Sequence, residues 1–328
     1  MRRFRAILLL LFAGCAARGT PGLSPSGALL ATIPVGTAPT FLAMAPDGRR
    51  LYAASNGTLS VIDTAANSEV VRLNTNPNST GIAIAPDGSQ VYIANLFSIT
   101  LSVVEIATNS LASSITLFAQ RRRGGFGFMA VAPDGRTLYI ANRANRAFGI
   151  IPLPGGGGRV LRPSVAPADI AISSDGGTVY SAGCKAICTP GFVNFFDTAT
   201  QRFGDEIAVG GNPFRIVLSP DGSRAYVANL TGPSVSVVDL AGRRVTATFR
   251  VPAQPTGLAV APDGGTLYVA SQTEGRLTAL DADSGETRGQ LAALRARDVT
   301  VSPDGRHVYV STADAVLVVD AQALGRGQ

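Results

Sequence analysis

Residues 81–95 read GIAIAPDGSQVYIAN, and this stretch decides the fold. An alternating run from Gly81 to Pro86 precedes an Asp-Gly pair, and a second apolar run carries Tyr92. Alternation indicates β-strands, and Asp-Gly favours a tight turn because glycine tolerates positive φ. The pattern recurs, since every tyrosine of the chain lies five residues after the aspartate of an Asp-Gly pair. The seven tyrosines are Tyr52, Tyr92, Tyr139, Tyr180, Tyr226, Tyr268 and Tyr309.

The spacing of this repeat predicts the architecture. Successive tyrosines are 40 to 47 residues apart, and a period near 40 built from strands is typical of β-propellers. We expect an all-β, seven-bladed β-propeller with four-stranded blades, formed by residues 28–328 as a single domain. The last unit ends near Asp320 without a fourth strand. The N-terminal stretch 29–36 should therefore complete blade 7 and close the ring, which removes exposed sheet edges.

The sequence resembles the YVTN-repeat β-propellers. The resemblance rests on Tyr92-Ile-Ala-Asn95, Tyr139-Ile-Ala-Asn142, Tyr226-Val-Ala-Asn229, Val61-Ile-Asp63-Thr64 and Phe195-Phe-Asp197-Thr198. It covers about residues 28 to 321, with departures at Pro152, Ser174 and Gly183. It implies the propeller fold and a setting in the bacterial cell envelope, and it implies no particular activity.

The N-terminus has the pattern of an export signal. A basic segment from Met1 to Arg5 precedes a short apolar run, so residues 1–14 are interpreted as a signal peptide. Phe12-Ala-Gly-Cys15 resembles a bacterial lipobox, which implies that Cys15 is lipidated and anchors the protein to a membrane. Residues 15–27 would then include a flexible tether, and the protein would be a periplasmic or cell-surface lipoprotein. An ordinary signal peptide, cut near Ala16 or Ala17, is the alternative.

Composition excludes some classes of site. The formal net charge is +6, and without Arg2, Arg3 and Arg5 only 25 basic residues oppose 22 acidic ones, so the mature chain is mildly basic. His307 is the only histidine, which excludes metal hydrolases with several histidine ligands. We expect no metal, no cofactor and no catalytic residues.

Cys184 and Cys188 lie in a long loop of blade 4. In an exported protein, cysteines this close usually form a disulfide. Free thiols and a metal or redox role are the alternatives.

The innermost strands vary at their first position, where the chain enters the channel. That position holds Phe41, Gly81, Phe128, Asp169, Arg215, Gly257 and Asp298 around the ring. Packing explains uniform positions, so we interpret the varied ones as available for binding. The hypothesis is a ligand site made of Phe41, Phe128, Asp169, Arg215 and Asp298.

A second hypothesis concerns arginines on the same face. Arg121, Arg122, Arg123 and Phe126 lie in the insert between blades 2 and 3. Loops that enter a first strand share a face with loops between second and third strands, which brings Arg143 and Arg146 to that face. Arginines beside aromatics suit anionic groups, so these six residues form a hypothetical anion-binding patch. A solvated charged loop is the alternative.

Together these features favour a non-catalytic binding or scaffold propeller of the cell envelope. We expect a monomer that recognises an anionic ligand or an envelope protein on the top face, which is the face where the first strands begin. The alternatives are a lactonase-like hydrolase on the same fold, a binder of single-stranded nucleic acid or another polyanion, and an accessory subunit of a redox enzyme.

Overall fold

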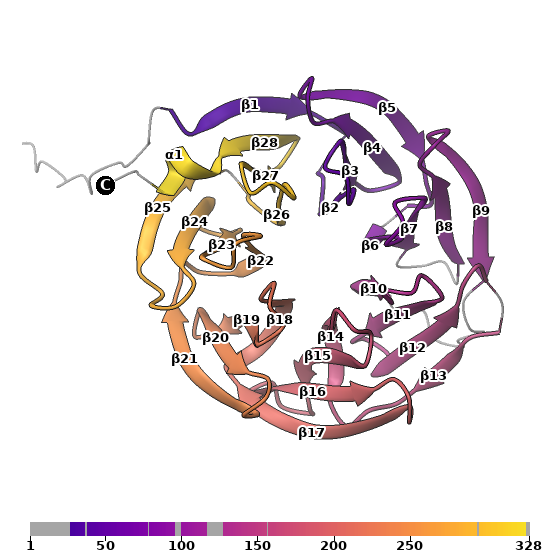
Figure 1. Cartoon of the computed structure of the whole chain (residues 1–328), viewed down its shortest axis with the longest axis vertical. Coiled ribbons are helices and arrows are strands. Elements are labelled where there is room, and N and C mark those ends of the chain that lie inside the picture. The colour runs from indigo at the N-terminus through magenta and orange to yellow at the C-terminus, as the bar shows by residue number, and fades with distance from the viewer. Residues whose placement is uncertain are drawn as a thin grey trace, which may run out of the picture.

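The chain forms a closed ring of seven four-stranded antiparallel sheets around a central axis, and we call the region along this axis the channel (Figure 1). The computed structural model describes residues 27–325, except 37, 78, 96–99, 117–126, 156 and 294. Blades 1 to 7 are numbered in chain order, and strands run outward from the channel within each blade. The all-β, seven-bladed prediction is confirmed.

The two inner strands of each blade flank the Asp-Gly turn, and the second of them contains the repeat tyrosine. The first strands are β2 (Phe41–Met44), β6 (Ser79–Ile84), β10 (Met129–Val131), β14 (Ala166–Ile172), β18 (Gly211–Leu218), β22 (Pro255–Val260) and β26 (Val299–Val301). The second strands are β3 (Arg50–Ala54), β7 (Gln90–Asn95), β11 (Thr137–Asn142), β15 (Thr178–Cys184), β19 (Arg224–Thr231), β23 (Thr266–Ser271) and β27 (His307–Ser311).

The two outer strands finish each blade. The third strands are β4 (Thr58–Asp63), β8 (Thr100–Glu105), β12 (Ala147–Pro152), β16 (Gly191–Asp197), β20 (Ser234–Asp239), β24 (Arg276–Asp281) and β28 (Ala315–Asp320). The fourth strands are β5 (Ser68–Asn74), β9 (Ser110–Thr116), β13 (Arg159–Leu161), β17 (Arg202–Val209), β21 (Arg244–Arg250), β25 (Thr287–Ala292) and β1 (Leu29–Pro34).

The two ends of the propeller meet in blade 7. Strand β1 pairs antiparallel with β28, placing Leu29 opposite Val319 and Ile33 opposite Val316. The sheet order β1-β28-β27-β26 therefore contains one strand from the start of the fold and three from its end. This is the predicted closure of the ring.

The Asp-Gly pairs form the turns between first and second strands. All seven glycines have φ between 69° and 74°, a region that strains other residues. In every turn the aspartate Oδ1 accepts a hydrogen bond from the backbone N–H two residues later, as Asp47 does from Arg49 at 2.9 Å. The sequence pattern is thus explained by local turn geometry.

The prolines of these turns have a second role. A Cβ added to Gly48 would lie 3.0 Å from Cδ of Pro303, in the turn of the neighbouring blade. The same neighbour relation joins Gly88 to Pro46, Gly176 to Pro133, Gly264 to Pro220 and Gly305 to Pro262. At Gly135 and Gly222 no described atom lies within 4 Å of an added Cβ; the blade before Gly222 has Ser174 in place of proline, whereas the blade before Gly135 has Pro86. Proline and glycine therefore help to fit one turn against the next.

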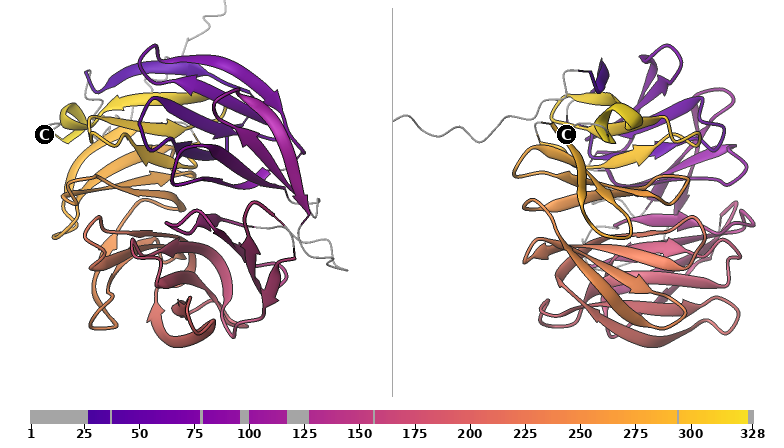
Figure 2. Two further views of the ribbon diagram at one scale, coloured as in Figure 1. Left: turned by 45° about the vertical axis from the view of Figure 1, so that its right-hand side comes forward. Right: turned by 60° about the vertical axis from the view of Figure 1, so that its left-hand side comes forward.

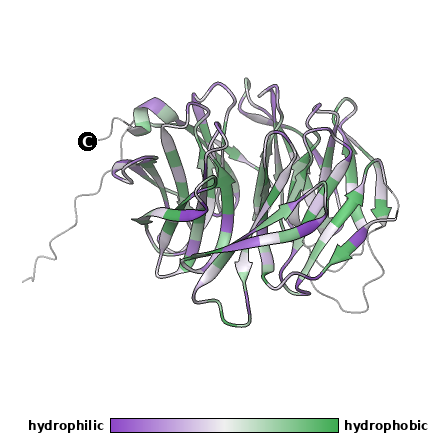
Figure 3. Ribbon diagram, turned by 60° about the horizontal axis from the view of Figure 1, so that its bottom comes forward, coloured by the Kyte–Doolittle hydropathy of each residue, from purple (hydrophilic) through white to green (hydrophobic). Residues whose placement is uncertain are grey.

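The apolar core lies between blades. Seven clusters of buried residues occur in the described part of the chain, each formed by two neighbouring blades. Every cluster contains one tyrosine of the repeat, such as Tyr309 of blade 7, which packs with Leu51 and Ile62 of blade 1. The side views show the sheets standing beside one another, and apolar residues concentrate in their strands (Figures 2 and 3).

A short C-terminal helix, α1 (Ala321–Gly325), was not predicted. Its Leu324 is fully buried, and a Cβ added to Gly289 of β25 would lie 1.7 Å from the Leu324 carbonyl oxygen. The close approach of the helix explains why this outer strand has a glycine there. In the described part of the chain, no helix has the length and apolar character needed to cross a membrane.

Ring closure makes the inner face of β1 sensitive to substitution. Ile33→Ala should lower the free energy of unfolding by about 2–5 kcal/mol, because Ile33 is only 1% exposed and its loss leaves a cavity between blades 7 and 1. Leu30→Ala on the same strand is the control. Leu30 is 49% exposed, and its loss should change stability by no more than about 0.5 kcal/mol. Equal effects in urea unfolding would contradict the closure.

Candidate ligand site at the channel mouth

The first strands of four blades are bulged where they begin. Pairing with the second strand shifts register around Thr80, Ala168, Phe214 and Thr256, each of which is the extra residue of a β-bulge. Bulges re-aim side chains and are common beside functional sites. We call the face on which the first strands begin the top face, and these bulges surround the channel there.

Arg215 is the centre of a charged network at the channel. Its guanidinium Nη2 donates to Oδ1 of Asp298 at 2.8 Å, and Nη1 lies 3.8 Å from Oδ2 of Asp169. The three residues come from blades 5, 7 and 4. One arginine therefore links its neighbour blade 4 and also blade 7, which is not adjacent to blade 5.

The two carboxylates also join neighbouring blades. Asp169 accepts a hydrogen bond from Ile216 N–H of blade 5 at 2.8 Å, and Asp298 accepts one from Leu42 N–H of blade 1 at 2.9 Å. Burial raises the pKa of Asp169 to about 6, against the effect of Arg215 and two backbone N–H groups. Burial likewise raises the pKa of Asp298, against Arg215. Two buried carboxylates share one cation, so their negative charge is not fully matched.

An aromatic cluster lies against this network. The Phe41 and Phe128 rings meet edge to face with centroids 5.2 Å apart, and Phe214 meets Phe128 in the same way at 5.6 Å. The Arg215 guanidinium lies over the Phe128 ring, 4.3 Å from its centroid. The structure thus brings together all five residues of the ligand-site hypothesis, while their role in binding stays a prediction.

A pocket of about 250 Å³ opens at the channel mouth. It is lined by Thr40, Phe41, Phe128, Phe214, Thr256, Gln272, Arg297 and Asp298. Three of these, Phe41, Phe128 and Asp298, belong to the ligand-site hypothesis. Four others, Thr40, Phe214, Thr256 and Arg297, occupy the position just before the one that the sequence comparison examined. That position also varies between blades, so the same comparison, moved by one residue, would have found them.

Two of the varied positions are fixed by packing, which corrects the view that this variation reflects binding alone. A Cβ added to Gly81 would lie 2.5 Å from the carbonyl oxygen of Gly127. One added to Gly257 would lie 2.8 Å from Cα of Asp298. Glycine is needed at both places because the next blade approaches so closely.

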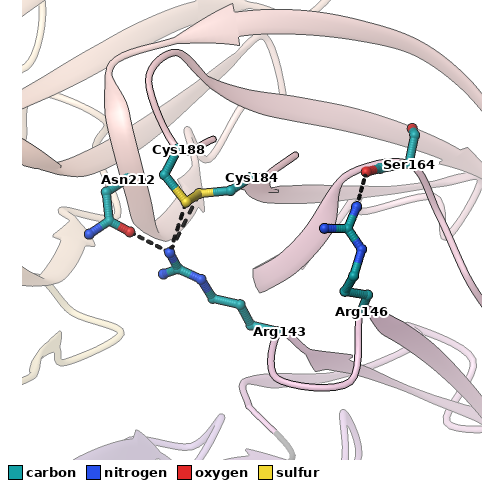
Figure 4. Close-up of a disulfide and its surroundings, with 6 residues drawn as sticks. All are labelled: Arg143, Arg146, Ser164, Cys184, Cys188 and Asn212. Atoms are coloured by element: carbon teal, nitrogen blue, oxygen red, sulfur yellow. Dashed lines mark hydrogen bonds between the residues drawn. A yellow bond between two sulfur atoms is a disulfide. The ribbon is translucent and has the colours of Figure 1, made fainter. Parts of the chain in front are cut away.

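Two arginines of the hypothetical anion-binding patch, Arg143 and Arg146, lie in the described part of the chain, and both form hydrogen bonds within the protein. Arg143 Nη2 donates to Oδ1 of Asn212 at 2.6 Å and lies 3.2 Å from Sγ of Cys188 (Figure 4). Arg146 instead donates to the Ser164 carbonyl oxygen at 2.8 Å. Burial lowers the pKa of Arg143. The remaining members of the patch, Arg121, Arg122, Arg123 and Phe126, lie outside the described residues, as does Cys15, for which lipidation stays a prediction.

The predicted disulfide between Cys184 and Cys188 is present, with Cα atoms 4.8 Å apart. It closes a short loop, which stabilises the fold by about 2 kcal/mol in the chain-entropy model. Cys188 O also accepts a hydrogen bond from Asn212 N–H at 2.7 Å. The loop between β15 and β16 therefore contacts the start of β18, so these two kinds of loop share the top face.

The residues that usually hold metals do not gather in the described part of the chain. No group of three or more His, Cys, Asp or Glu side chains is placed there to bind an ion. His307 lies in β27 at the end near the Asp-Gly turns, with its ring centroid 6.4 Å from that of Tyr309. It lies in blade 7 toward the face opposite the top face, away from the mouth pocket.

Comparison with known proteins supports the fold. A chain of hydrazine synthase from Kuenenia stuttgartiensis matches with a TM-score of 0.78 and 21% identity, over 88% of this chain and 97% of that one. The β-propeller domain of Cps50 (Swd1) from Myceliophteria thermophila matches with a TM-score of 0.76 and 12% identity, over 89% and 98%. No family model and no curated protein matches the sequence. At these identities the likeness shows the fold alone.

The raised pKa of Asp169 predicts an unusual pH dependence. The folded state holds the Asp169 proton more tightly than the unfolded state, so its stabilisation is complete below about pH 4 and is lost as pH rises through about 6. Between about pH 4.5 and pH 7, the unfolding free energy of the wild type should fall by about 2 kcal/mol relative to Asp169→Asn.

Asp221 provides the control. Hydrogen bonds from Ser219 and Ser223 lower its pKa to about 2. The stability that this carboxylate contributes is therefore lost only at pH values below the interval from 4.5 to 7. The difference between the wild type and Asp221→Asn should be constant over the same pH range. Urea unfolding at several pH values measures both. A constant difference for Asp169→Asn would show that this carboxyl has an ordinary pKa.

Proposed function

We propose that this protein is a non-catalytic binding propeller of the bacterial cell envelope, which takes a small ligand at the mouth of its channel on the top face. The observation that carries the proposal is the pocket walled by Phe41, Phe128 and Phe214. Ligand sites are typically concave and mostly apolar, with a few polar groups that fix orientation. This pocket combines three phenylalanine rings with five polar or charged residues, and two of its lining residues, Phe214 and Thr256, belong to β-bulges.

The acidic residues of the site are better suited to structure than to catalysis. Both oxygens of Asp298 accept hydrogen bonds, from Leu42 N–H, Val299 N–H and Arg215. Asp169 accepts bonds from Ile170 and Ile216 N–H groups. A general base needs an oxygen within reach of substrate, and these oxygens are occupied. This favours a binding protein over a lactonase-like hydrolase.

The mouth pocket is also favoured over the arginine patch. Arg143 and Arg146 donate to Asn212 and to the Ser164 carbonyl oxygen, so part of their hydrogen-bonding capacity is already used within the protein. A polyanion would have to compete with these contacts.

We also propose membership of the YVTN-repeat propellers. Support comes from the equivalent burial of all seven repeat tyrosines, which are 0–9% exposed and occupy the same place in their second strands. The lipobox-like segment ending at Cys15 extends this proposal to a lipid-anchored, exported protein.

A ligand screen tests the binding function. Thermal shift with a library of small acids, amines and sugars should give compounds that stabilise the wild type, by about 2.7 kcal/mol at a hundredfold excess over Kd. Phe214→Ala should abolish these shifts because it removes one wall of the pocket. Phe203→Ala removes the same ring in outer strand β17 and should preserve them. If no compound stabilises the wild type, or the hits survive Phe214→Ala, the mouth pocket is not the binding site.

Substitution of Cys15 tests the anchor. Cys15→Ser should move the protein from the membrane fraction to the soluble envelope fraction or leave its signal peptide uncleaved, because acyl chains hold a protein at a membrane by burying CH₂ groups. Fractionation and intact mass measure this. Membrane association and mass unchanged apart from the substitution itself would refute lipidation.

A further inference from the structure

Among the polar residues that line the mouth pocket, Arg297 can only donate hydrogen bonds, Asp298 carries the negative charge, and Thr40, Thr256 and Gln272 can donate or accept. The carboxylate of Asp298 lines the pocket, but its oxygens already accept from Leu42, Val299 and Arg215. Arg215 counters its charge from 2.8 Å. A cationic ligand would therefore find no unoccupied carboxylate among the described residues of the pocket wall.

Arg297 has capacity to spare. Within the described residues it forms no ion pair, and its Nη1 donates a long hydrogen bond to Thr40 Oγ1 at 3.5 Å. Its Nε is buried and has no hydrogen-bond partner among the described residues. A buried donor left unpaired is costly, and such groups in folded proteins call for an explanation. Arg297 as a whole is half-buried and lines the pocket, so a ligand carboxylate there would give its guanidinium an anionic partner.

Thr256 points to the same kind of ligand. Its hydroxyl is buried and, in the described part of the chain, unpaired. It belongs to the bulge at the start of β22 and lines the same pocket as Arg297. A planar guanidinium and a hydroxyl together suit a carboxylate, which an arginine binds with two parallel hydrogen bonds.

The pocket also has an apolar wall. Phe41, Phe128 and Phe214 present their rings in edge-to-face contacts, an arrangement that accepts a further ring or an alkyl group. The volume of about 250 Å³ is slightly below the range for drug-sized ligands, so a smaller molecule is indicated.

We infer that the mouth pocket binds a small monocarboxylate with an aromatic or compact apolar body, and that Arg297 is the residue that recognises the carboxylate. The apolar body lies against Phe41, Phe128 and Phe214, and Thr256 supplies a further hydrogen bond. The inference rests on the proposed binding function and deepens it by naming the ligand class and a residue that sequence comparison did not single out.

Phenylacetate is the probe, and three analogues of similar or smaller size define what is recognised. 2-Phenylethanol has the ring without charge, 2-phenylethylamine has the opposite charge, and acetate has no ring. Calorimetric titration of the wild type should show phenylacetate binding at least tenfold more tightly than each of the three. Equal or tighter binding of the alcohol or the amine would overturn the inference, and so would a lack of phenylacetate binding at millimolar concentration.

Variants of Arg297 locate the charge recognition. Arg297→Gln should weaken phenylacetate binding at least tenfold and leave 2-phenylethanol binding unchanged. Arg297→Lys keeps the charge but loses the planar guanidinium, and should weaken binding less than Arg297→Gln. Arg295→Gln, two residues away at an exposed position, is the matched control and should bind like the wild type. Phenylacetate binding that survives Arg297→Gln would overturn the assignment.

The two levels of proposal fail differently. If 2-phenylethylamine or a neutral compound binds and Phe214→Ala abolishes it, the pocket is a binding site but not one for carboxylates. If the library gives no hit that depends on Phe214, the binding function at the mouth is itself wrong. Thermal unfolding of each variant, which should match the wild type within a few degrees, separates loss of binding from loss of fold.

Discussion

The burial of one tyrosine per blade against the next blade is the interaction on which the rest of the structure depends. Each apolar cluster contains residues of two blades, so a single blade cannot bury its own apolar face. The ring has to be complete for every cluster to be complete, which makes the pairing of β1 with β28 essential. The close approach of neighbouring blades also requires glycine at positions 81 and 257 beside the channel. Other blades have large side chains at the equivalent position. The mouth pocket forms where those large side chains meet.

Most of the fold could be predicted because it depends on local and periodic signals. The seven Asp-Gly pairs set the turns through positive φ at glycine, and the missing fourth strand of the last unit predicted β1 in blade 7. The contact of turn prolines with glycines of the next blade was not predicted, because it depends on how blades stack. Helix α1 was missed for a related reason: the five-residue segment has no helical periodicity, and Leu324 is fixed by tertiary packing against β25.

The candidate site was predicted in part. Comparing one position around the ring found Phe41, Phe128, Asp169, Arg215 and Asp298, which the structure brings together. It missed Phe214 and Thr256, which lie one residue earlier, because these are bulge residues and a bulge changes which residue faces the channel. The sequence also gave no indication that Asp169 and Asp298 would be occupied by backbone N–H groups. Their partners, Ile216 and Leu42, are ordinary apolar residues that act through main-chain atoms.

Closure of the ring by strands from opposite ends of the fold also affects how the protein is made. Strand β1 is synthesised first, yet its partner β28 is among the last segments to appear. Contacts between residues so distant in sequence carry a high contact order and form slowly. Until then the Ile33 side of β1 and the tyrosine face of blade 7 both lack a partner, and exposed strand edges of this kind favour aggregation. A chain in which β28 has not yet been made therefore leaves both of these surfaces uncovered.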